Sequence, residues 1–313
     1  MGATVSPGNS GIPEIIGRHP AMREVYRMIR LAATATLPVV IVGETGTGKE
    51  LVARAVHRAG TRREGPFVDL NCAAIPDNLA EAELFGWERG AFTGAHRRMP
   101  GLLEAADNGT LFLDEASSLS LGLQAKLLRA LELGTFRRVG GRPLLSAMFR
   151  IVVAVTEPVQ SLVAAGRMRE DFAYRIGGIT IDLPPLRLRG QDLHLLANHF
   201  LNAANHNGHP KKSLHPSALD QLRHHRWPGN VRELQMVIER LAICVEGPTI
   251  TASHVLQGMA TPRLGPMPRE SLEGALVAHS WDVARTARSL GIGRTTLYAL
   301  MRRQGLRRPP TLA

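Results

Sequence analysis

The stretch PVVIVGETGTGKELV at residues 38–52 constrains the fold of this chain more than any other. Its apolar, β-branched first half predicts a buried strand, and the residues from Lys49 onward follow helical spacing. Between the two lies a turn rich in glycine and threonine, in which Gly43, Gly48 and Lys49 have the spacing G-x-x-x-x-G-K. A strand, a glycine loop and a helix in this order predict a phosphate-binding loop.

The residue types of this loop suit a polyphosphate ligand. Glycine lets the backbone curl so that N–H groups and the helix N-terminus point at the phosphates, while Lys49 adds a point charge. A Ser or Thr that binds Mg²⁺ usually follows the lysine, but here Glu50 follows, so the metal must be held from elsewhere. An ordinary glycine-rich turn is the alternative. The residues expected to bind the nucleotide are Gly43, Glu44, Thr45, Gly46, Thr47, Gly48, Lys49 and Glu50.

A second apolar run, residues 110–113, ends in Asp114 and Glu115. This pattern is typical of the other half of a P-loop ATPase site, in which Asp114 positions Mg²⁺ and Glu115 orients the attacking water. Because Ser117 and Ser118 follow, the alternative is that the two acids cap a helix. The apolar strand before them and the phosphate loop upstream favour the ATPase interpretation.

Strand and helix patterns alternate through residue 183. We therefore predict an α/β fold in which helices cover both faces of a parallel sheet. One helix between the last two strands is expected to carry Arg167, Arg169 and Arg175. The strands are expected at residues 39–42, 67–70, 110–113, 149–155 and 179–183.

Residues 186–259 show only helical patterns, which predict a smaller all-α module beside the nucleotide site. Asn230 follows a Trp-Pro-Gly turn and is expected to be the N-cap of the last of these helices. We expect the module to move with the site. Its helices are expected at residues 193–204, 217–224 and 230–245.

The segment GAFTGA at residues 90–95 places small residues around one aromatic side chain. Glycine disfavours a helix, and Phe92 alone cannot anchor a strand, so we predict a flexible loop that offers Phe92 and Thr93 to a partner. A plain surface turn is the alternative. A further hairpin or loop insertion is expected at residues 134–141.

Composition excludes several classes of protein. With 44% hydrophobic residues, a mean hydropathy of −0.05 and no apolar run long enough to cross a bilayer, the chain is expected to be globular and without membrane contact. Its two cysteines, far apart in sequence, indicate buried thiols in a reducing cytoplasm. An aromatic content of 4% disfavours an RNA reader that stacks bases.

The net charge of +11 is concentrated near the C-terminus, where nine arginines face three acids between residues 263 and 313. A helix expected at 270–279, and two more around a glycine turn at 291–293, predict a basic helix-turn-helix in which Leu297 and Met301 face inward. The concentration of positive charge favours a module that binds double-stranded DNA over a three-helix cap with a purely structural role. The residues expected to contact DNA are Arg294, Thr295, Thr296, Tyr298, Arg302 and Arg303.

Together these motifs resemble the bacterial sigma-54-dependent transcriptional activators, or enhancer-binding proteins, of the AAA+ ATPase superfamily. The resemblance runs from about residue 15 to 306, and within it a glutamate after the phosphate-loop lysine is a family trait. GAFTGA is its most specific part. The motifs that match in order are GETGTGKE (43–50), ELFG…GAFTGA (83–95), LFLDE (111–115), RVGG (138–141) and WPGNVREL (227–234).

The resemblance implies a role for several residues around the nucleotide. Asn71 would hold Glu115 back until the γ-phosphate is sensed, and Arg232 would touch the γ-phosphate from the lid. Arg169 and Arg175 would be arginine fingers that enter the neighbouring subunit, so activity would need a ring, expected to be a hexamer. The resemblance also places Ile16, Gly17 and Thr156 in the nucleotide site. Val155 and Thr156 stand where the family has Thr-Asn, which would alter sensing there.

It implies partners as well. The loop residues Gly90, Ala91, Phe92, Thr93, Gly94 and Ala95 would contact the sigma-54 RNA polymerase holoenzyme, with residues 137–141 as a companion loop. The C-terminal module would bind an upstream activating sequence as a Fis-type dimer. No regulatory domain is expected before residue 15, so control would be expected to come from expression level, a companion activator or an anti-activator.

The expected function is therefore an ATP-hydrolysing activator that uses Mg²⁺ and opens the sigma-54 promoter complex. The alternatives are an AAA+ ATPase that remodels other proteins or DNA, and a non-catalytic DNA regulator that works with the housekeeping sigma factor. The expected layout is a disordered N-terminus (1–12), an AAA+ α/β subdomain (13–185), an α-helical lid (186–259), a linker (260–268), the helix-turn-helix (269–308) and a tail (309–313).

Overall fold

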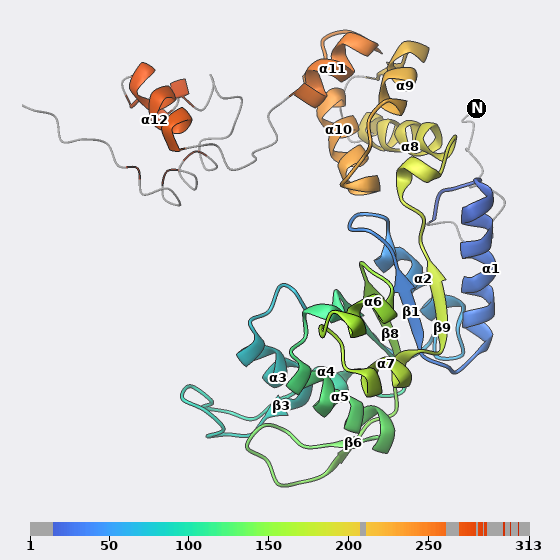
Figure 1. Cartoon of the computed structure of the whole chain (residues 1–313), viewed down its shortest axis with the longest axis vertical. Coiled ribbons are helices and arrows are strands. Elements are labelled where there is room, and N and C mark those ends of the chain that lie inside the picture. The colour runs from blue at the N-terminus through green and yellow to red at the C-terminus, as the bar shows by residue number, and fades with distance from the viewer. Residues whose placement is uncertain are drawn as a thin grey trace, which may run out of the picture.

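The computed structural model describes residues 15–206, 211–260 and 269–279, together with 281–283, 285–286, 297, 301 and 306. It contains an α/β domain, a group of lid helices beyond one edge of its sheet, and a further helix near the C-terminus (Figure 1). The expected N-terminal tail, the C-terminal tail and the linker, except for Ala260, lie outside the described residues. So do the residues expected to contact DNA, namely Arg294, Thr295, Thr296, Tyr298, Arg302 and Arg303.

The α/β domain is built on one five-stranded sheet with the order β2-β5-β8-β1-β9, and all its neighbouring strands are parallel. The prediction of a parallel sheet is confirmed. Because the strands are parallel, the segments that follow β1, β5 and β8 meet at one edge, which we call the carboxyl edge. The strands are β1 (Val39–Val42), β2 (Phe67–Asn71), β5 (Thr110–Asp114), β8 (Arg150–Val155) and β9 (Ile179–Asp182).

Helices cover both faces of the sheet. Val39 and Ile41 pack against α1 (Pro20–Thr34) and α2 (Lys49–Ala59), whereas Val40 points to the opposite face. This two-sided burial explains the β-branched run of β1, since each such side chain contributes roughly 1.5–3 kcal/mol when fully buried. The helices on the second face are α3 (Asp77–Phe85), α4 (Leu102–Ala105), α5 (Leu121–Leu133), α6 (Val159–Ala164) and α7 (Glu170–Ile176).

The single helix expected between β8 and β9 is in fact two helices, α6 and α7. Gly166 has φ +67°, a left-handed conformation that ends α6 as a glycine commonly does after a helix. Arg167 lies in the turn that follows, Arg169 is the N-cap of α7, and Arg175 lies in its last turn. The break therefore separates arginines that the sequence pattern placed on one helix.

Two short hairpins project from the α/β domain. The first pairs β3 (Gly86–Trp87) with β4 (Met99–Pro100) and carries the GAFTGA segment between its strands. The second pairs β6 (Thr135–Phe136) with β7 (Leu145–Ser146), which confirms the hairpin expected after α5. A bridge between Trp87 and Val139 joins the two hairpins.

The lid has its own core, in which Trp227 is almost fully buried and donates its indole Nε1–H to Leu222 O over 2.9 Å. The lid is helical, as expected, and the structure adds two features. A parallel bridge of β10 (Ser213–Leu214) and β11 (Thr249–Ile250) adds strand structure to the lid, and α11 is an additional helix. The lid helices are α8 (Asp192–His206), α9 (Pro216–Arg223), α10 (Asn230–Cys244) and α11 (Ala252–Ala260).

The helix expected at 270–279 is present as α12 (Arg269–Ala278). Leu272 and Leu276 of α12 pack with Leu297, and Met301 lies against this cluster. The inward position predicted for Leu297 and Met301 is therefore confirmed. Of the rest of the expected helix-turn-helix, the structure describes too few residues to trace the turn.

Both cysteines are free thiols, but only one is buried. Cys72 lies in the core after β2, as expected, whereas Cys244 at the end of α10 is exposed and contradicts the expectation of two buried thiols. Within the residues that the structure describes, no helix has both the length and the apolar character to cross a membrane.

Candidate nucleotide site and partner loops

The phosphate loop connects β1 to α2 at the carboxyl edge and folds around the Lys49 side chain. The Nζ atom of Lys49 donates to Gly43 O over 2.8 Å and to Glu44 O over 3.4 Å. Gly46 and Gly48 have φ +79° and +103°, a conformation that residues with a Cβ atom rarely adopt. The curled loop and the N-terminus of α2 form the kind of N–H cradle that binds phosphate.

Three charges meet below this loop. Burial lowers the pKa of Lys49, while the negative charges of Asp114 and Glu115 raise it. Burial also raises the pKa of Asp114, and the Lys49 ammonium opposes that rise. The phosphate-loop lysine and the two strand-end acids are therefore close enough to interact electrostatically, as an ATPase site requires.

Glu115 has a strained backbone. Its φ of +53° and ψ of +44° are left-handed, which for a residue with a side chain costs on the order of 1 kcal/mol. The Glu115 N–H donates to Asp114 Oδ1 over 3.0 Å, and the following 3-10 turn begins without a side-chain cap from either acid. The helix-cap alternative for the two acids is therefore wrong, and both carboxylates remain at the carboxyl edge.

Asn71 lies beside Asp114 in the sheet but uses its side chain within its own turn. Its Oδ1 accepts hydrogen bonds from the N–H groups of Ala73 over 3.0 Å and Ala74 over 3.2 Å. In the described part of the chain no hydrogen bond joins Asn71 to Glu115. The switch role remains a prediction, and the structure adds that Asn71 fixes the turn leading into α3.

Thr156 follows β8 at the same edge. The Gly43 N–H donates to Val155 O over 3.1 Å, so the phosphate loop starts directly beside Thr156. Next to Thr156, Glu157 accepts a hydrogen bond from Arg167 over 2.7 Å. Sequence reasoning did not identify this ion pair.

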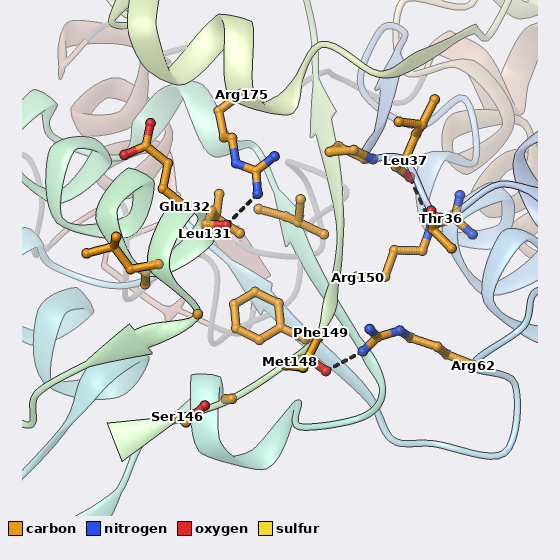
Figure 2. Close-up of a pocket in the computed structure, with 16 residues that line it drawn as sticks. Thr36, Leu37, Arg62, Leu131, Glu132, Ser146, Met148, Phe149, Arg150 and Arg175 are labelled. Carbon is orange, nitrogen blue, oxygen red and sulfur yellow. Dashed lines mark hydrogen bonds between the residues drawn. The ribbon is translucent and has the colours of Figure 1, made fainter. Parts of the chain in front are cut away.

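In the described residues, the two arginines expected to act as fingers bond to groups outside their own phosphate loop. Arg169 is exposed and makes two hydrogen bonds to Asp171, of 2.9 and 2.7 Å. Arg175 donates to Leu131 O and lines a cavity of about 570 Å³ together with Arg62 and Arg150 (Figure 2). This cavity lies at the amino ends of β1 and β8, at the edge opposite the phosphate loop.

Arg232 reaches the phosphate loop through its backbone. The N–H groups of Val231 and Arg232, at the start of α10, donate to Gly46 O over 2.9 and 3.3 Å. A Cβ atom on Gly46 would lie 2.2 Å from Gly229 O, so only glycine allows this approach. Arg232 also contributes to the lowered pKa of Lys49, which places its charge near the site.

Ile16 and Gly17 lie where the α/β domain meets the lid. Ile16 packs against the lid core, and a Cβ atom on Gly17 would lie 2.9 Å from Asp192 Oδ2. Asp192 is buried and accepts hydrogen bonds from the backbone N–H groups of Arg18 and His19. The structure thus places these two predicted residues at the base of the lid.

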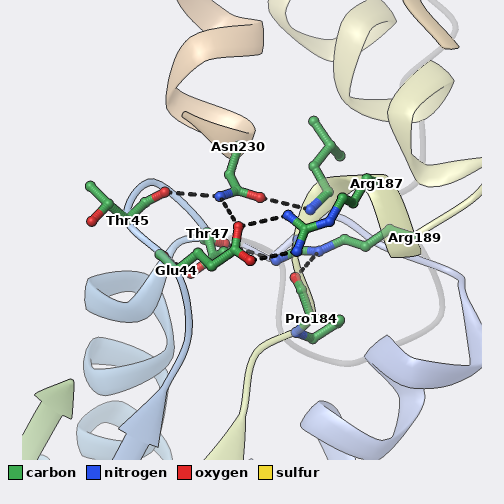
Figure 3. Close-up of polar contacts among 8 residues, drawn as sticks. Glu44, Thr45, Thr47, Pro184, Arg187, Arg189 and Asn230 are labelled. Atoms are coloured by element: carbon green, nitrogen blue, oxygen red, sulfur yellow. Dashed lines mark hydrogen bonds and ion pairs between the residues drawn. The ribbon is translucent and has the colours of Figure 1, made fainter. Parts of the chain in front are cut away.

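Asn230 is not the N-cap that the sequence predicted. Gly229 takes that position, and Asn230 is fully buried with φ +52°. The Asn230 side chain accepts from Leu186 N over 2.8 Å and donates to Glu44 Oε2 over 3.2 Å and Thr45 O over 3.0 Å (Figure 3). Tertiary contacts with the phosphate loop therefore replace the local cap.

Two arginines before α8 also contact the phosphate loop, and sequence reasoning missed both. Arg187 makes two hydrogen bonds to the Glu44 carboxylate, of 2.8 and 2.6 Å. Arg189 is 2% exposed and donates to Thr47 O and Pro184 O, each over 2.9 Å. The sequence offers only two arginines that alternate with leucines after Pro184-Pro185, a pattern that names no partner.

The GAFTGA segment forms a compact turn. The Gly90 N–H donates to Ala95 O over 2.8 Å, and the Ala95 N–H donates to Phe92 O over 3.0 Å. Phe92 is 42% exposed, with its ring centroid 5.7 Å from that of Trp87, and Thr93 is exposed. Ala95 is buried, so of the six residues expected to meet a partner it is the one that cannot present its side chain.

The GAFTGA turn contacts the second hairpin. A Cβ atom on Gly140 would lie 2.8 Å from Ala91 Cβ, so the segments 90–95 and 138–141 pack closely. Below them Arg138, 5% exposed, forms ion pairs with Glu88 and Glu104. The expected companion loop is therefore adjacent to the GAFTGA turn and is linked to its base by charge.

The fold and the site together define a P-loop nucleotide-binding domain with a helical lid. The model of the Sigma-54 interaction domain family matches residues 15–182, that of the AAA+ ATPase lid domain matches 187–270, and that of the Fis family of bacterial regulatory proteins matches 269–303. The chain belongs to the sigma-54 interaction domain family, which confirms the resemblance drawn from the motifs.

Curated relatives align with most of this chain. The DNA-binding transcriptional regulator NtrC of Azospirillum brasilense is 47% identical over 84% of this chain and 55% of its own length. The Nif-specific regulatory protein of Azotobacter vinelandii is 43% identical over 89% of this chain and 56% of its own length. This chain thus spans about half the length of these two relatives.

Solved structures agree with the fold. NtrX from Brucella abortus in complex with ADP superposes with a TM-score of 0.72 at 30% identity, over 93% of this chain and 69% of that one. Its complex with ATP gives the same TM-score at 31% identity, over 94% and 69%. In those relatives of the same architecture, adenine nucleotides are bound.

Proposed function

We propose that this chain hydrolyses ATP and uses the energy to convert the closed complex of the sigma-54 RNA polymerase into an open complex. One observation carries the proposal: α3 starts just after the Asn71 turn and runs directly into the hairpin that presents Phe92. A change at the carboxyl edge of the sheet would therefore be transmitted to the GAFTGA turn by a single short helix. The family to which the chain belongs and its regulatory relatives support this proposal.

In the nucleotide site, Lys49 and the loop N–H groups would hold the phosphates, and Glu115 would orient the attacking water. Asp114 suits Mg²⁺, because its carboxylate lies at the carboxyl edge near Lys49 and carboxylate oxygen is a ligand that Mg²⁺ prefers. Bound there, Mg²⁺ would neutralise charge on the phosphates. Glu50 accepts a hydrogen bond from Arg54 over 2.8 Å, so its carboxylate is engaged on the surface of α2.

Assembly is part of the proposal. Arg169 and Arg175 are exposed and bond to groups outside their own phosphate loop, which leaves them at the surface where a neighbouring subunit could meet them. We infer a homo-oligomeric ring, with six subunits as the family resemblance implies, in which these arginines complete the neighbour's site. Activity then depends on protein concentration.

The remaining partners follow from the family. The Fis-type module would bind double-stranded DNA at an upstream activating sequence through the arginines of its second helix. Because that DNA would be chromosomal, we infer a cytoplasmic location. Thr93 and Phe92 would contact the sigma factor. A companion activator or an anti-activator would supply control.

The test is single-round open-complex formation at a sigma-54 promoter, with ATP turnover measured in parallel. Thr93→Ala should abolish open complexes and leave most of the ATPase activity, because Thr93 lies on the exposed turn and outside the nucleotide site. Full activity of Thr93→Ala in both assays would refute the role of the loop. ATP turnover by the unaltered chain without any effect on sigma-54 promoters would indicate an ATPase that remodels another target.

A further inference from the structure

The phosphate loop and the lid are joined by a polar cluster that the proposed mechanism does not use. We call this cluster the loop–lid latch and define it as Glu44 on the loop with Arg187 and Asn230 on the lid side. The Glu44 carboxylate accepts two hydrogen bonds from Arg187, of 2.8 and 2.6 Å, and one from Asn230 over 3.2 Å (Figure 3). Asn230 is fully buried, whereas Glu44 and Arg187 are partly exposed.

We propose that Glu44 is a positioning residue, which holds the lid through Arg187 and Asn230 at the angle that lets Arg232 reach the γ-phosphate of bound ATP. This inference rests on the proposed ATPase function and deepens it. It assigns to the second residue of the phosphate loop a role in lid position, separate from binding the phosphates.

The contact between α10 and the loop explains why lid angle and loop shape are coupled. The first N–H groups of a helix have no partner within the helix and must find one elsewhere. In α10 the N–H groups of Val231 and Arg232 find that partner in Gly46 O. Any movement of the loop backbone therefore moves the helix that carries the Arg232 side chain.

Arg189 gives the same junction a fixed point. It is 2% exposed, and its guanidinium bonds the carbonyl oxygens of Thr47 and Pro184, each over 2.9 Å. A buried arginine bound to two carbonyl groups is costly to detach. The partly exposed Glu44–Arg187 pair, by contrast, costs less to open. The junction thus combines a pivot at Arg189 with a latch that can be released.

The charge of Glu44 is otherwise hard to explain. An acid beside a polyphosphate is electrostatically unfavourable, and glutamine would make the same contacts with Asn230. Arg187, and to a smaller extent Asn230, lower the pKa of Glu44, so the carboxylate is charged and directed at the lid. A charged carboxylate is needed only if the ion pair itself sets the position of the lid.

The experiment compares Glu44→Gln and Arg187→Gln in the full chain. Dissociation constants for ATP and ADP are measured together with kcat, KM and deuterium uptake at the amides of residues 230–233. We expect the dissociation constant for ATP to rise about tenfold, a typical coupling between sites, and that for ADP to change less than about twofold, because ADP has no γ-phosphate for Arg232. Exchange at the Val231 and Arg232 amides should accelerate about tenfold.

The double variant Glu44→Gln with Arg187→Gln should have a dissociation constant for ATP no higher than that of either single variant, because both substitutions remove the same interaction. Glu24→Gln is the matched control, since it breaks an exposed Glu–Arg pair of similar geometry on α1 and should change neither affinity nor exchange. Arg187→Gln alters a partly exposed side chain outside the loop, so it tests the latch even if Glu44→Gln fails to fold.

An equal loss of affinity for ATP and for ADP would show that Glu44 shapes the phosphate loop, and this result would overturn the proposal. Unchanged exchange at residues 230–233 would overturn it as well. None of these measurements needs the sigma factor or DNA. Failure of the latch is therefore distinguishable from failure of the proposed function, which is read from open-complex formation.

Discussion

Arg138 Nη1 donates to Glu88 Oε1 over 2.7 Å, so an arginine of the second hairpin is held at the base of the turn that presents Phe92. The same guanidinium also bonds Glu104 just after β4. Only 4% of the Arg138 side chain is exposed. One cation thus joins three segments that flank the GAFTGA turn and helps to fix the position of the turn.

We expect Arg138→Gln to reduce the free energy of unfolding by about 3 kcal/mol, because it leaves two partly buried carboxylates without their cation. Urea unfolding followed by circular dichroism measures this change. Arg142→Gln, on an exposed arginine of the same hairpin, should stay within about 0.5 kcal/mol of the unaltered chain. Equal stabilities of the two variants would contradict the central role of Arg138.

Replacement of Glu115 should separate binding from turnover. We expect Glu115→Gln to reduce kcat about a thousandfold, because the amide cannot accept the proton of the attacking water. The affinity for ATP should stay unchanged. Phosphate release and equilibrium binding of ATP provide the two readouts. Glu81→Gln, which removes the carboxylate of an exposed pair with Lys126, serves as the control and should change neither.

Mixing of two inactive variants tests the shared site. Arg169→Ala and Glu115→Gln should each be inactive alone, while an equimolar mixture should recover roughly a quarter of the activity, since that share of interfaces pairs an intact arginine with an intact acid. A mixture as inactive as its components would show that Arg169 does not act on a neighbouring subunit.

Two glycines of the phosphate loop offer a matched comparison. Gly46→Ala and Gly48→Ala both place a side chain at positive φ, but only at Gly46 would the new Cβ atom meet lid backbone, 2.2 Å from Gly229 O. At Gly48 the nearest atom is 3.9 Å away. We expect Gly46→Ala alone to accelerate deuterium exchange at the start of α10 in the chain without nucleotide. Similar exchange in both variants would contradict the close contact between loop and lid.

The two thiols should react very differently. A disulfide reagent at pH 8 should modify Cys244 rapidly and leave Cys72 unmodified until the chain unfolds, because burial raises the pKa of the Cys72 thiol to about 12. A folded pKa above the ordinary value of 9.0 means that this thiol supports the folded state fully below pH 9.0 and that its contribution is lost as the pH rises toward 12. Cys72→Ala should weaken that alkaline loss, which urea unfolding between pH 8 and about 11 would detect. Fast modification of both thiols in the folded chain would contradict this assignment.

Local patterns predicted the parallel sheet, the phosphate loop and the strand-end acids. A strand buried on both faces requires a continuous apolar run, and a curled loop requires closely spaced glycines, so both signals lie in consecutive residues. The N-cap at Asn230 was predicted wrongly for the opposite reason. Its side chain bonds Glu44, far away in sequence, and a tertiary partner of this kind leaves no periodic signal. The contacts of Arg187 and Arg189 were missed likewise, since a long arginine side chain usually keeps its charged end in water.

Short elements account for the remaining errors. The pairing of β10 with β11 involves two residues on each strand, too few for alternation to show. The break between α6 and α7 depends on the left-handed conformation of Gly166, and a single glycine in a helical pattern is commonly tolerated.

The buried position of Arg189 has a mechanical consequence. Helix α10 has 15 residues and starts on the phosphate loop close to this pivot. At 1.5 Å per residue it is about 22 Å long, so a tilt of about 5° at its base displaces its far end by about 2 Å. A small rearrangement of one carbonyl group in the phosphate loop would therefore produce a larger displacement at the far end of α10.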